Sequence, residues 1–406
     1  MILAIIFFML VFSYSIVSKL LGRSIITAPM VFTAAGMTIP FFSSISWEVD
    51  KNLKVLLFIA EMGLVLLLFT DASRIRLKDI KGLHWLPARL LTIGMLLTII
   101  LGTAGALAVF PSLSLWEAGI IAAILAPTDA GLGQVIVSNP RVPSRIRNSL
   151  NIEAGLNDGM SVPFLMFFIA LAQSESAGEN VLARFLIEQL GYGMAIGALI
   201  GLAGGWLLGW AHRAGCMEEP AGQIGLAALP VLSLILAKPS GASMFIIAFV
   251  AGMATQVGFK DVGEHSVEFT EEWGQLFNYF VFFFLGIMAS RAWGRFSWDL
   301  ILYAALSLTL IRMVPVAAAL AGTRLSRATV LFMGWFGPRG LASIVLGLVY
   351  LEYEANLPGE PLIRLAVMVT VLMSVFTHGV TALPGINVYE KNVTRFAPGA
   401  AEIREV

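Results

Sequence analysis

Apolar residues recur along the chain in long runs, which short polar clusters, prolines and glycines separate. An α-helix rises about 1.5 Å per residue, so about 20 mostly apolar residues cross the ~30 Å hydrocarbon core of a bilayer. Runs of this length occur throughout the sequence, which predicts an all-α polytopic membrane protein. We predict thirteen spans, near 2–21, 25–43, 53–70, 86–110, 115–138, 146–172, 181–211, 222–237, 241–258, 270–290, 298–321, 327–351 and 362–384.

Lysines and arginines are distributed unevenly between the predicted loops. They concentrate in the loops after spans one, three and five, for example at Arg74, Arg76 and Lys78, and at Arg141 and Arg145. The positive-inside rule then places the N-terminus outside and the C-terminus in the cytoplasm of a multi-pass protein of the cell (inner) membrane. The first run lacks a basic n-region and a small-residue cleavage site, so we expect a retained span and no signal peptide.

Composition narrows the class of protein further. Of the 406 residues, 58% are hydrophobic and 13% are charged, whereas soluble domains have roughly a quarter charged residues. The 26 basic residues equal the 26 acidic residues in number, which gives nucleic acid no electrostatic support as a partner. Cys216 is the one cysteine and there are four histidines, so neither an internal disulfide nor a His-based metal site is expected. We predict that the protein is not an enzyme and has no cofactor.

Charged residues inside the apolar spans are candidates for function. Each costs at least about 2.5–3.5 kcal/mol on insertion scales, so each is expected to have a partner or a role. Asp71 lies at a span end, where a snorkelling or capping role is favoured over ion binding. For Glu61 the two interpretations remain equally open. The residues singled out are Glu61, Asp71, Asp129, Glu153, Asp158, Arg312 and Arg339.

Spans five and twelve each contain a predicted break in the helix. Pro127 removes a backbone donor in span five, and Gly337-Pro338 does the same in span twelve. Interrupted helices at matching places in two six-span halves indicate an inverted-repeat secondary transporter with its site at the membrane midplane. In such a site Asp129 would offset the positive N-terminal helix ends, and Arg339 the negative C-terminal ends.

Span six has polar residues that stack along its length. Glu153 and Asn157 are four residues apart and share a face, whereas Asp158 lies about 100° further round. A buried structural ion pair is the favoured interpretation for Glu153 and Arg312. Asp158 has no cation close in sequence and is followed by the helix-weakening Gly159, so a functional role is favoured for Asp158.

The order of these motifs resembles that of a known family, the monovalent cation/proton antiporters of the NhaP and sodium/proton exchanger type. The resemblance covers essentially the whole chain, including the closing segment 373–384. The motifs, in order, are Pro127-Thr128-Asp129, Glu153-xxx-Asn157-Asp158, the intramembrane Arg312 and Gly337-Pro338-Arg339-Gly340.

The resemblance implies a single transmembrane antiporter unit over 1–406, built from inverted six-helix repeats in which spans five and twelve cross as broken helices. It also implies a homodimer. The expected parts are a core bundle near 86–172 and 298–384, dimerisation or scaffold helices near 1–70 and 222–290, and a linker helix near 181–211.

The resemblance also implies roles for residues at the ion site. Asp158 corresponds to the aspartate that binds both the cation and the proton, with Asn157 as its neighbour. Thr128 corresponds to the threonine that helps ligate the ion at the crossing point, and Asp129 to the carboxylate beside it. Glu61 corresponds to an acidic residue that lies near the ion in some members.

Two further correspondences complete the expected site. Glu153 and Arg312 correspond to the family's stabilising ion pair. Some members have a serine directly after the glutamate, where its hydroxyl contributes to the ion site. Here that position is Ala154, so one oxygen ligand has to come from backbone or water.

The expected activity is secondary active exchange of a monovalent cation (Na⁺, with Li⁺ or K⁺ left open) for H⁺. One carboxylate that binds either ion, with Asn157 beside it in place of a second aspartate, predicts electroneutral 1:1 exchange with elevator-type alternating access. The alternatives are an ion channel, a sodium-coupled organic-anion symporter and a membrane sensor. Proton-coupled, saturable cation flux would distinguish the antiporter from all three.

Overall fold

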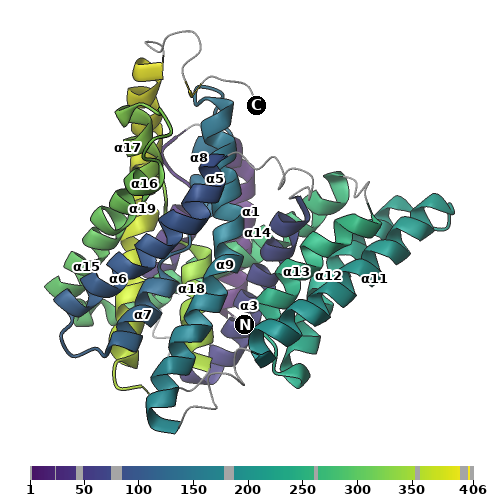
Figure 1. Ribbon diagram of the computed structural model, residues 1–406, viewed down its shortest axis with the longest axis horizontal. Helices are drawn as coiled ribbons and strands as arrows, with labels where there is room; N and C mark the ends of the chain where they lie inside the picture. The colour runs from purple at the N-terminus through teal and green to yellow at the C-terminus, as the bar shows by residue number, and fades with distance from the viewer. Residues whose placement is uncertain are drawn as a thin grey trace. The chain divides into compact units, whose positions relative to one another are not determined.

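The computed structural model describes residues 2–22, 24–42, 49–74, 85–177, 187–259, 264–352, 357–393 and 401–402, and these are helical apart from short connections (Figure 1). No strand occurs among them. The all-α prediction is therefore confirmed. The basic loop residues Arg76 and Lys78, and residues 181–186 of the predicted linker, lie outside the described residues.

Helices occupy the places at which the apolar runs predicted them. In the first half of the chain these are α1 (Ile2–Leu21), α2 (Ala28–Phe42), α3 (Val49–Arg74), α5 (Trp85–Arg89), the π-helical η1 (Leu90–Gly94), α6 (Met95–Val109), α7 (Leu115–Ile124), α8 (Ala130–Val137) and α9 (Ser144–Ala177). In the second half they are η2 (Ile187–Tyr192), α11 (Gly193–Arg213), α12 (Glu219–Ser240), α13 (Met244–Gly258), α14 (Glu264–Ala292), the 3₁₀-helical η3 (Trp293–Arg295), α15 (Trp298–Leu308), α16 (Leu310–Ala319), α17 (Arg327–Trp335), α18 (Leu341–Glu352) and α19 (Glu360–Val393).

Length and composition make many of these helices suitable for crossing a membrane. Among the described residues, eight helices are long and apolar enough to span a bilayer, and four shorter apolar helices accompany them. Two of the shorter ones, α7 and α18, are halves of the predicted broken spans five and twelve. The chain is a multi-pass membrane protein, and the total of thirteen spans remains a prediction.

Two of the predicted spans have internal features that periodicity did not show. Span 298–321 consists of two helices, α15 and α16, because Thr309 has φ −112° and ψ −93° and interrupts the helical backbone. The Thr309 hydroxyl donates a hydrogen bond of 2.6 Å to the Ala305 carbonyl, in competition with the backbone ladder. The interruption lies one turn before Arg312. Span 86–110 contains the π-helical turn η1.

The chain divides into two compact units. The first unit comprises Met1–Glu48, His84–Asn157 and Tyr279–Val406, and the second comprises Val49–Leu83 and Asp158–Asn278. The predicted partition into core, scaffold and linker helices is a different division and remains a prediction.

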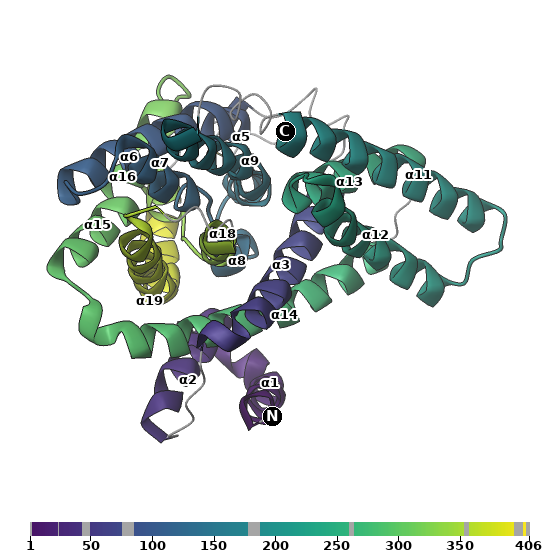
Figure 2. The ribbon, with the colours of Figure 1, turned by 90° about the horizontal axis from the view of Figure 1, so that it is seen from below.

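In the second unit, α11 packs against α13 (Figure 2). A row of glycines lies on the face of α11 that meets α13. The buried residues of α11 are all glycine and recur every four positions, which places them on one face of the helix. A Cβ atom at Gly201 would overlap the Ala251 carbonyl, and one at Gly205 would overlap the Thr255 carbonyl. The two backbones can therefore approach closely only because these positions have no side chain. The row, which we call the glycine seam, is Gly193, Gly197, Gly201, Gly205 and Gly209.

In the first unit, α15 and α17 pack against α19, and α16 packs against α17 (Figure 1). A cluster of buried apolar side chains lies between α9, α16, α17 and α19 and includes Ile146, Val316, Met333 and Ile386. This apolar packing supports the two broken spans from their ends. The polar residues of the site lie where the spans are interrupted.

Candidate functional site

The break in the first broken span separates α7 from α8. The helical backbone of α7 ends at Ile124, and residues 125–129 run between the two helices. Pro127 lies within this stretch and has no backbone N–H to continue the helix. Asp129 is the N-cap of α8, where its Oδ1 accepts a hydrogen bond of 2.9 Å from the Leu132 amide.

The second broken span crosses the first at its own interruption. The helix α17 ends at Trp335 and α18 begins at Leu341. At the crossing, the Asp129 backbone amide donates a hydrogen bond of 2.8 Å to the Pro338 carbonyl. The second carboxylate oxygen of Asp129, Oδ2, accepts a hydrogen bond of 2.6 Å from the Leu341 amide. One carboxylate therefore caps the N-terminal ends of both α8 and α18, where helix dipoles are positive.

Arg339 lies at the crossing beside the C-terminal end of α7, where the helix dipole is negative. Its guanidinium donates to the carbonyls of Ala126 and Pro127 at 2.8 and 3.0 Å, just beyond the C-terminal end of α7. The side chain is fully buried, with 0% exposed. A cation at the negative ends and an anion at the positive ends compensate the charges that the two breaks create in a low-dielectric environment.

Two glycines make room for the charged side chains at the second break. A Cβ atom at Gly340 would overlap the Asp129 carboxylate, and one at Gly337 would overlap the Arg312 guanidinium. Both positions therefore need glycine for close approach and not for an unusual backbone angle. The Gly-Pro-Arg-Gly run supplies the break and its cation, and it also supplies the space for Asp129 and Arg312.

Glu153 of α9 and Arg312 of α16 form a bidentate ion pair. The Arg312 Nη1 to Glu153 Oε1 distance is 2.6 Å, and the Nη2 to Oε2 distance is 2.9 Å. Both residues are buried, with 2% and 3% of their surfaces exposed. A paired, two-point geometry is the one in which buried charges are stable, because each guanidinium N–H that enters the pair replaces water with a carboxylate oxygen.

Asn157 of α9 holds Thr128 at two points. The Thr128 amide donates to Asn157 Oδ1 at 3.2 Å, which leaves the Asn157 Nδ2 to donate to the Thr128 hydroxyl oxygen at 2.7 Å. Since a hydroxyl oxygen has two lone pairs, one remains for a further donor or a cation. Both residues are buried. Asn157 therefore fixes the position of an oxygen at the crossing.

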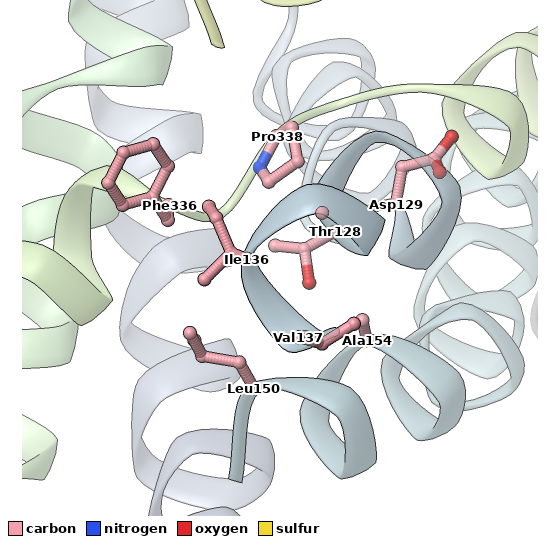
Figure 3. A pocket seen from close by; sticks show the side chains of 9 residues that line it. Thr128, Asp129, Ile136, Val137, Leu150, Ala154, Phe336 and Pro338 are labelled. Atoms are coloured by element: carbon pink, nitrogen blue, oxygen red, sulfur yellow. The ribbon is translucent and has the colours of Figure 1, made fainter. Parts of the chain in front are cut away.

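A small cavity lies beside Thr128 in the first unit (Figure 3). Thr128 and Pro338 line it at the two breaks, and Leu150 and Ala154 line it from α9. Figure 3 shows the Thr128 hydroxyl pointing toward the side of Leu150 and Ala154, whereas the Asp129 carboxylate points away. At Ala154 a methyl group lines the cavity.

The other sequence-predicted residues lie in the second unit. Asp158 directly follows Asn157 on α9, is partly buried and begins the segment Asp158–Asn278. Glu61 lies on α3 with 1% of its surface exposed, and Asp71 lies near the end of the same helix and is partly buried. The structure thus brings together Thr128, Asp129, Glu153, Asn157, Arg312 and Arg339, which all belong to the first unit.

Sequence reasoning missed two polar residues that contact the second break. Ser374 and His378 of α19 are buried, and Ser374 Oγ accepts a hydrogen bond of 2.7 Å from the Arg339 amide. Their spacing of four residues within an otherwise apolar helix is the signal that would have identified them. Both lie in the closing segment 373–384, whose polar residues had no assigned role.

Comparisons with known proteins show the family of the chain and its fold. Residues 4–385 match the sodium/hydrogen exchanger transmembrane family. A Na⁺/H⁺ antiporter of Schizosaccharomyces pombe is 27% identical over 281 residues, which cover 64% of this chain and 58% of the relative. A K⁺/H⁺ antiporter, NhaP2, of Shewanella sp. (strain ANA-3) is 24% identical over 339 residues, covering 79% and 55%. The matches thus span little more than half the length of these relatives.

A solved structure has the same fold. The sodium proton antiporter from Methanocaldococcus jannaschii aligns with a TM-score of 0.72 at 21% identity, covering 92% of this chain and 97% of that one. At this level of identity the likeness concerns the fold. The match over 4–385 shows that this chain belongs to the sodium/hydrogen exchanger transmembrane family.

Proposed function

We propose that the protein exchanges a monovalent cation for H⁺ across the membrane, with Asp158 as the carboxylate that binds either ion. The observation that carries the proposal is the crossing of two charge-compensated breaks at Thr128, which Asn157 holds at two points. Asp158 is the next residue on α9. Asp129 has both carboxylate oxygens engaged by helix N-termini, so Asp129 acts as a cap and leaves ion binding to Asp158.

A small cation needs several oxygen ligands, which carboxylates, hydroxyls, backbone carbonyls and water supply. Asp158 and Thr128 would provide the side-chain oxygens. The Ala126 and Pro127 carbonyls already accept hydrogen bonds from Arg339. Water or another carbonyl would therefore supply the oxygen ligand that the Ala154 side chain does not provide. Glu61 would join the cycle only if it takes up a proton.

The stoichiometry follows from the number of titrating groups. A single carboxylate is neutralised by one H⁺ or by one monovalent cation, so the loaded carrier has the same charge in both states. Exchange would then be 1:1 and electroneutral. The Glu153–Arg312 pair does not change this count, because a fixed pair contributes equally to both loaded states.

Alternating access would occur by an elevator-type movement of the core bundle. The residues 86–172 and 298–384 contain every residue that meets at the crossing, so the site would travel with one rigid group of helices. We propose Na⁺ as the first cation to test, with K⁺ and Li⁺ as further arms, since the relatives include both Na⁺/H⁺ and K⁺/H⁺ antiporters. We further propose a homodimer with its N-terminus outside and its C-terminus in the cytoplasm.

Replacement of Asp158 by Asn tests the assignment. The substitution keeps size and most hydrogen bonding but removes the titrating charge, so cation-driven proton flux should fall to background. The measurement is the signal of a pH dye inside proteoliposomes after pulses of Na⁺, Li⁺ or K⁺. Asp71→Asn, the same exchange at a predicted membrane edge, is the matched control and should retain flux. Wild-type flux in Asp158→Asn would reject the assignment.

An imposed membrane potential tests the stoichiometry. An uncompensated charge would experience ~2.3 kcal/mol per 100 mV, whereas an electroneutral cycle experiences none. Exchange of Na⁺ for H⁺ should therefore reach the same steady-state gradient with and without a K⁺/valinomycin potential, once K⁺ transport has been excluded. A gradient that shifts with voltage would contradict the one-carboxylate cycle. Repeating the measurement on Glu61→Gln would then show whether Glu61 carries the second proton.

A further inference from the structure

The helix α19 holds both ends of the break between α17 and α18. His378 Nε2 lies 3.0 Å from the carbonyl oxygen of Trp335, the last residue of α17. His378 Nδ1 lies 3.1 Å from Ser374 Oγ, which in turn accepts the hydrogen bond of 2.7 Å from the Arg339 amide at the other end of the break. The Trp335 indole N–H also donates to Thr381 on α19, at 3.0 Å. A chain of hydrogen bonds through His378 and Ser374 thus connects residues 335 and 339.

The partners of the ring determine its protonation. A carbonyl oxygen only accepts, so Nε2 must carry a hydrogen to bond with Trp335. Nδ1 faces Ser374, whose side-chain Oγ and backbone carbonyl oxygen each lie at 3.1 Å. The Trp335 contact thus requires a hydrogen on Nε2, and Ser374 is the partner of Nδ1.

This chain of contacts ends at the crossing. Arg339, whose amide Ser374 binds, directs its guanidinium at the carbonyls of Ala126 and Pro127. Pro127 directly precedes Thr128. His378 is 2% exposed, so water cannot take over its contacts. A change in the separation of residues 335 and 339 would therefore be transmitted through Arg339 to the backbone that presents the Thr128 oxygen.

We propose that His378 is a positioning residue for cation binding. Through Nε2–H on the Trp335 carbonyl and Nδ1 on Ser374, it fixes the separation of the two ends of the α17/α18 break, and it thereby fixes the direction of the Arg339 side chain toward the backbone beside Thr128. The inference rests on the proposed antiport function, since it assigns His378 to the same site. It places His378 outside the ion's own ligands, so its loss should weaken cation binding without removing exchange.

Two amide substitutions separate the roles of the two ring nitrogens. The amide nitrogen of Gln lies about as far from the backbone as Nε2 of histidine, so His378→Gln can still donate to the Trp335 carbonyl. The amide of Asn reaches only the position of Nδ1, so His378→Asn keeps the contact with Ser374 and loses the one with Trp335. His378→Leu loses both. His212→Asn, on the exposed end of α11, is the control for histidine replacement itself.

The expected result is a split between KM and kcat in the proteoliposome assay. Loss of one buried hydrogen bond corresponds to about a three- to tenfold change in an equilibrium constant. His378→Asn and His378→Leu should therefore raise the KM for Na⁺ by about that factor, with kcat within about twofold of wild type. His378→Gln keeps the contact with Trp335 but loses the one between Nδ1 and Ser374, so it should raise the KM as well, whereas His212→Asn should keep the wild-type KM. A purely structural role would lower kcat or the amount of folded protein and leave KM unchanged.

A second measurement does not depend on transport. Cation binding raises the Tm of the purified protein, and the Na⁺ concentration that gives half of this increase should rise by the same factor in His378→Asn. Wild-type KM in both Asn and Leu variants would overturn the proposal. So would a wild-type KM in the Gln variant, or a loss confined to kcat.

Ser374→Ala keeps the proposal testable if no His378 variant folds. It removes the link between His378 and the Arg339 amide, so it should also raise the KM for Na⁺, and a wild-type KM would overturn the proposal. Failure of the antiport function is a separate result. It would appear as wild-type protein without cation-driven proton flux, or as Asp158→Asn protein that retains flux.

Discussion

The crossing and the glycine seam hold helices together in opposite ways. At the crossing the backbone is interrupted twice, and side chains replace the missing helical hydrogen bonds: Asp129 caps two N-termini and Arg339 binds two carbonyls. At the seam the helices are continuous, and glycines such as Gly201 and Gly205 let the backbones approach without any polar side chain.

The difference shows what a break contributes to a membrane protein. Continuous helices satisfy their own backbone, so close packing is enough to join them, and the seam presents no groups to an ion. A broken helix exposes donors and acceptors that need partners, and the partners at the crossing are charged. Charged groups and a hydroxyl in a fixed position are the kinds of group from which ion sites are built. The two regions should therefore respond differently to substitution.

The largest effect on stability is expected at the ion pair beside the crossing. Replacing Glu153 or Arg312 by Gln leaves a buried charge without its partner, which costs about 3–5 kcal/mol of folding stability. The double variant should recover much of this loss, and a double-mutant cycle in thermal unfolding measures the coupling. The partly exposed Arg141–Glu390 pair, at 3.4 Å, is the matched control, since Glu390→Gln should cost about 1 kcal/mol or less. Simple additivity at Glu153 and Arg312 would show that they do not act as a pair.

An intermediate effect is expected at the glycine seam. A leucine at position 201 would overlap the Ala251 carbonyl and force α11 and α13 apart, at a cost of about 1–3 kcal/mol or more. The measurement is the Tm of Gly201→Leu in detergent. Ala203→Leu places the same side chain on the exposed face of α11 and should leave the Tm nearly unchanged. Equal Tm values for the two variants would show that close backbone approach does not hold this seam.

The smallest effect on stability is expected at the N-terminus of α17, at a contact that lies outside the membrane-spanning segments. Glu402 Oε1 accepts hydrogen bonds from the Ser326 amide at 2.7 Å and from the Thr329 hydroxyl at 3.0 Å, at the N-terminus of α17. Burial by itself raises the pKa of Glu402, but these hydrogen bonds outweigh burial, so its pKa lies below the ordinary value. Glu402→Gln should cost about 1 kcal/mol of stability.

The sign of the pH dependence follows from the lowered pKa. The Glu402 contribution is fully present above the ordinary unfolded pKa of about 4.3 and disappears as the pH falls through the lower folded value. Urea unfolding of wild type and Glu402→Gln should therefore show a constant difference at neutral pH that shrinks below about pH 4. A difference that grows on acidification would contradict a carboxylate cap at α17.

The sequence predicted much of the crossing because its signals are local. Pro127 and Gly337-Pro338 interrupt helices wherever they fall, and a charged residue in an apolar run requires compensation. From these rules the sequence predicted breaks in spans five and twelve and assigned Asp129 and Arg339 to opposite helix ends. In the structure, Asp129 binds the amides of Leu132 and Leu341, and Arg339 binds carbonyls beyond α7.

Other features depend on residues that are distant in sequence. The hydrogen bonds between Asn157 and Thr128 join positions that are 29 residues apart, and neither segment alone predicts them. The role of Gly340 depends on the Asp129 carboxylate that lies against it. The glycine seam did have a local signal, a glycine at every fourth position, but its partner on α13 did not. The interruption at Thr309 could not be predicted from hydrophobic periodicity either, because both α15 and α16 are apolar.

By itself, the sequence determined that this protein is an all-α, multi-pass membrane protein with two broken spans and unusually placed charges. It did so because the bilayer permits few backbone solutions and makes each exception costly. The tertiary structure decided which donor meets which acceptor: one carboxylate shared by two helices, one guanidinium on two carbonyls, and a histidine across a break. Those choices depend on donor–acceptor distances that must be correct to within a few tenths of an ångström, between segments that only the packed helices bring together.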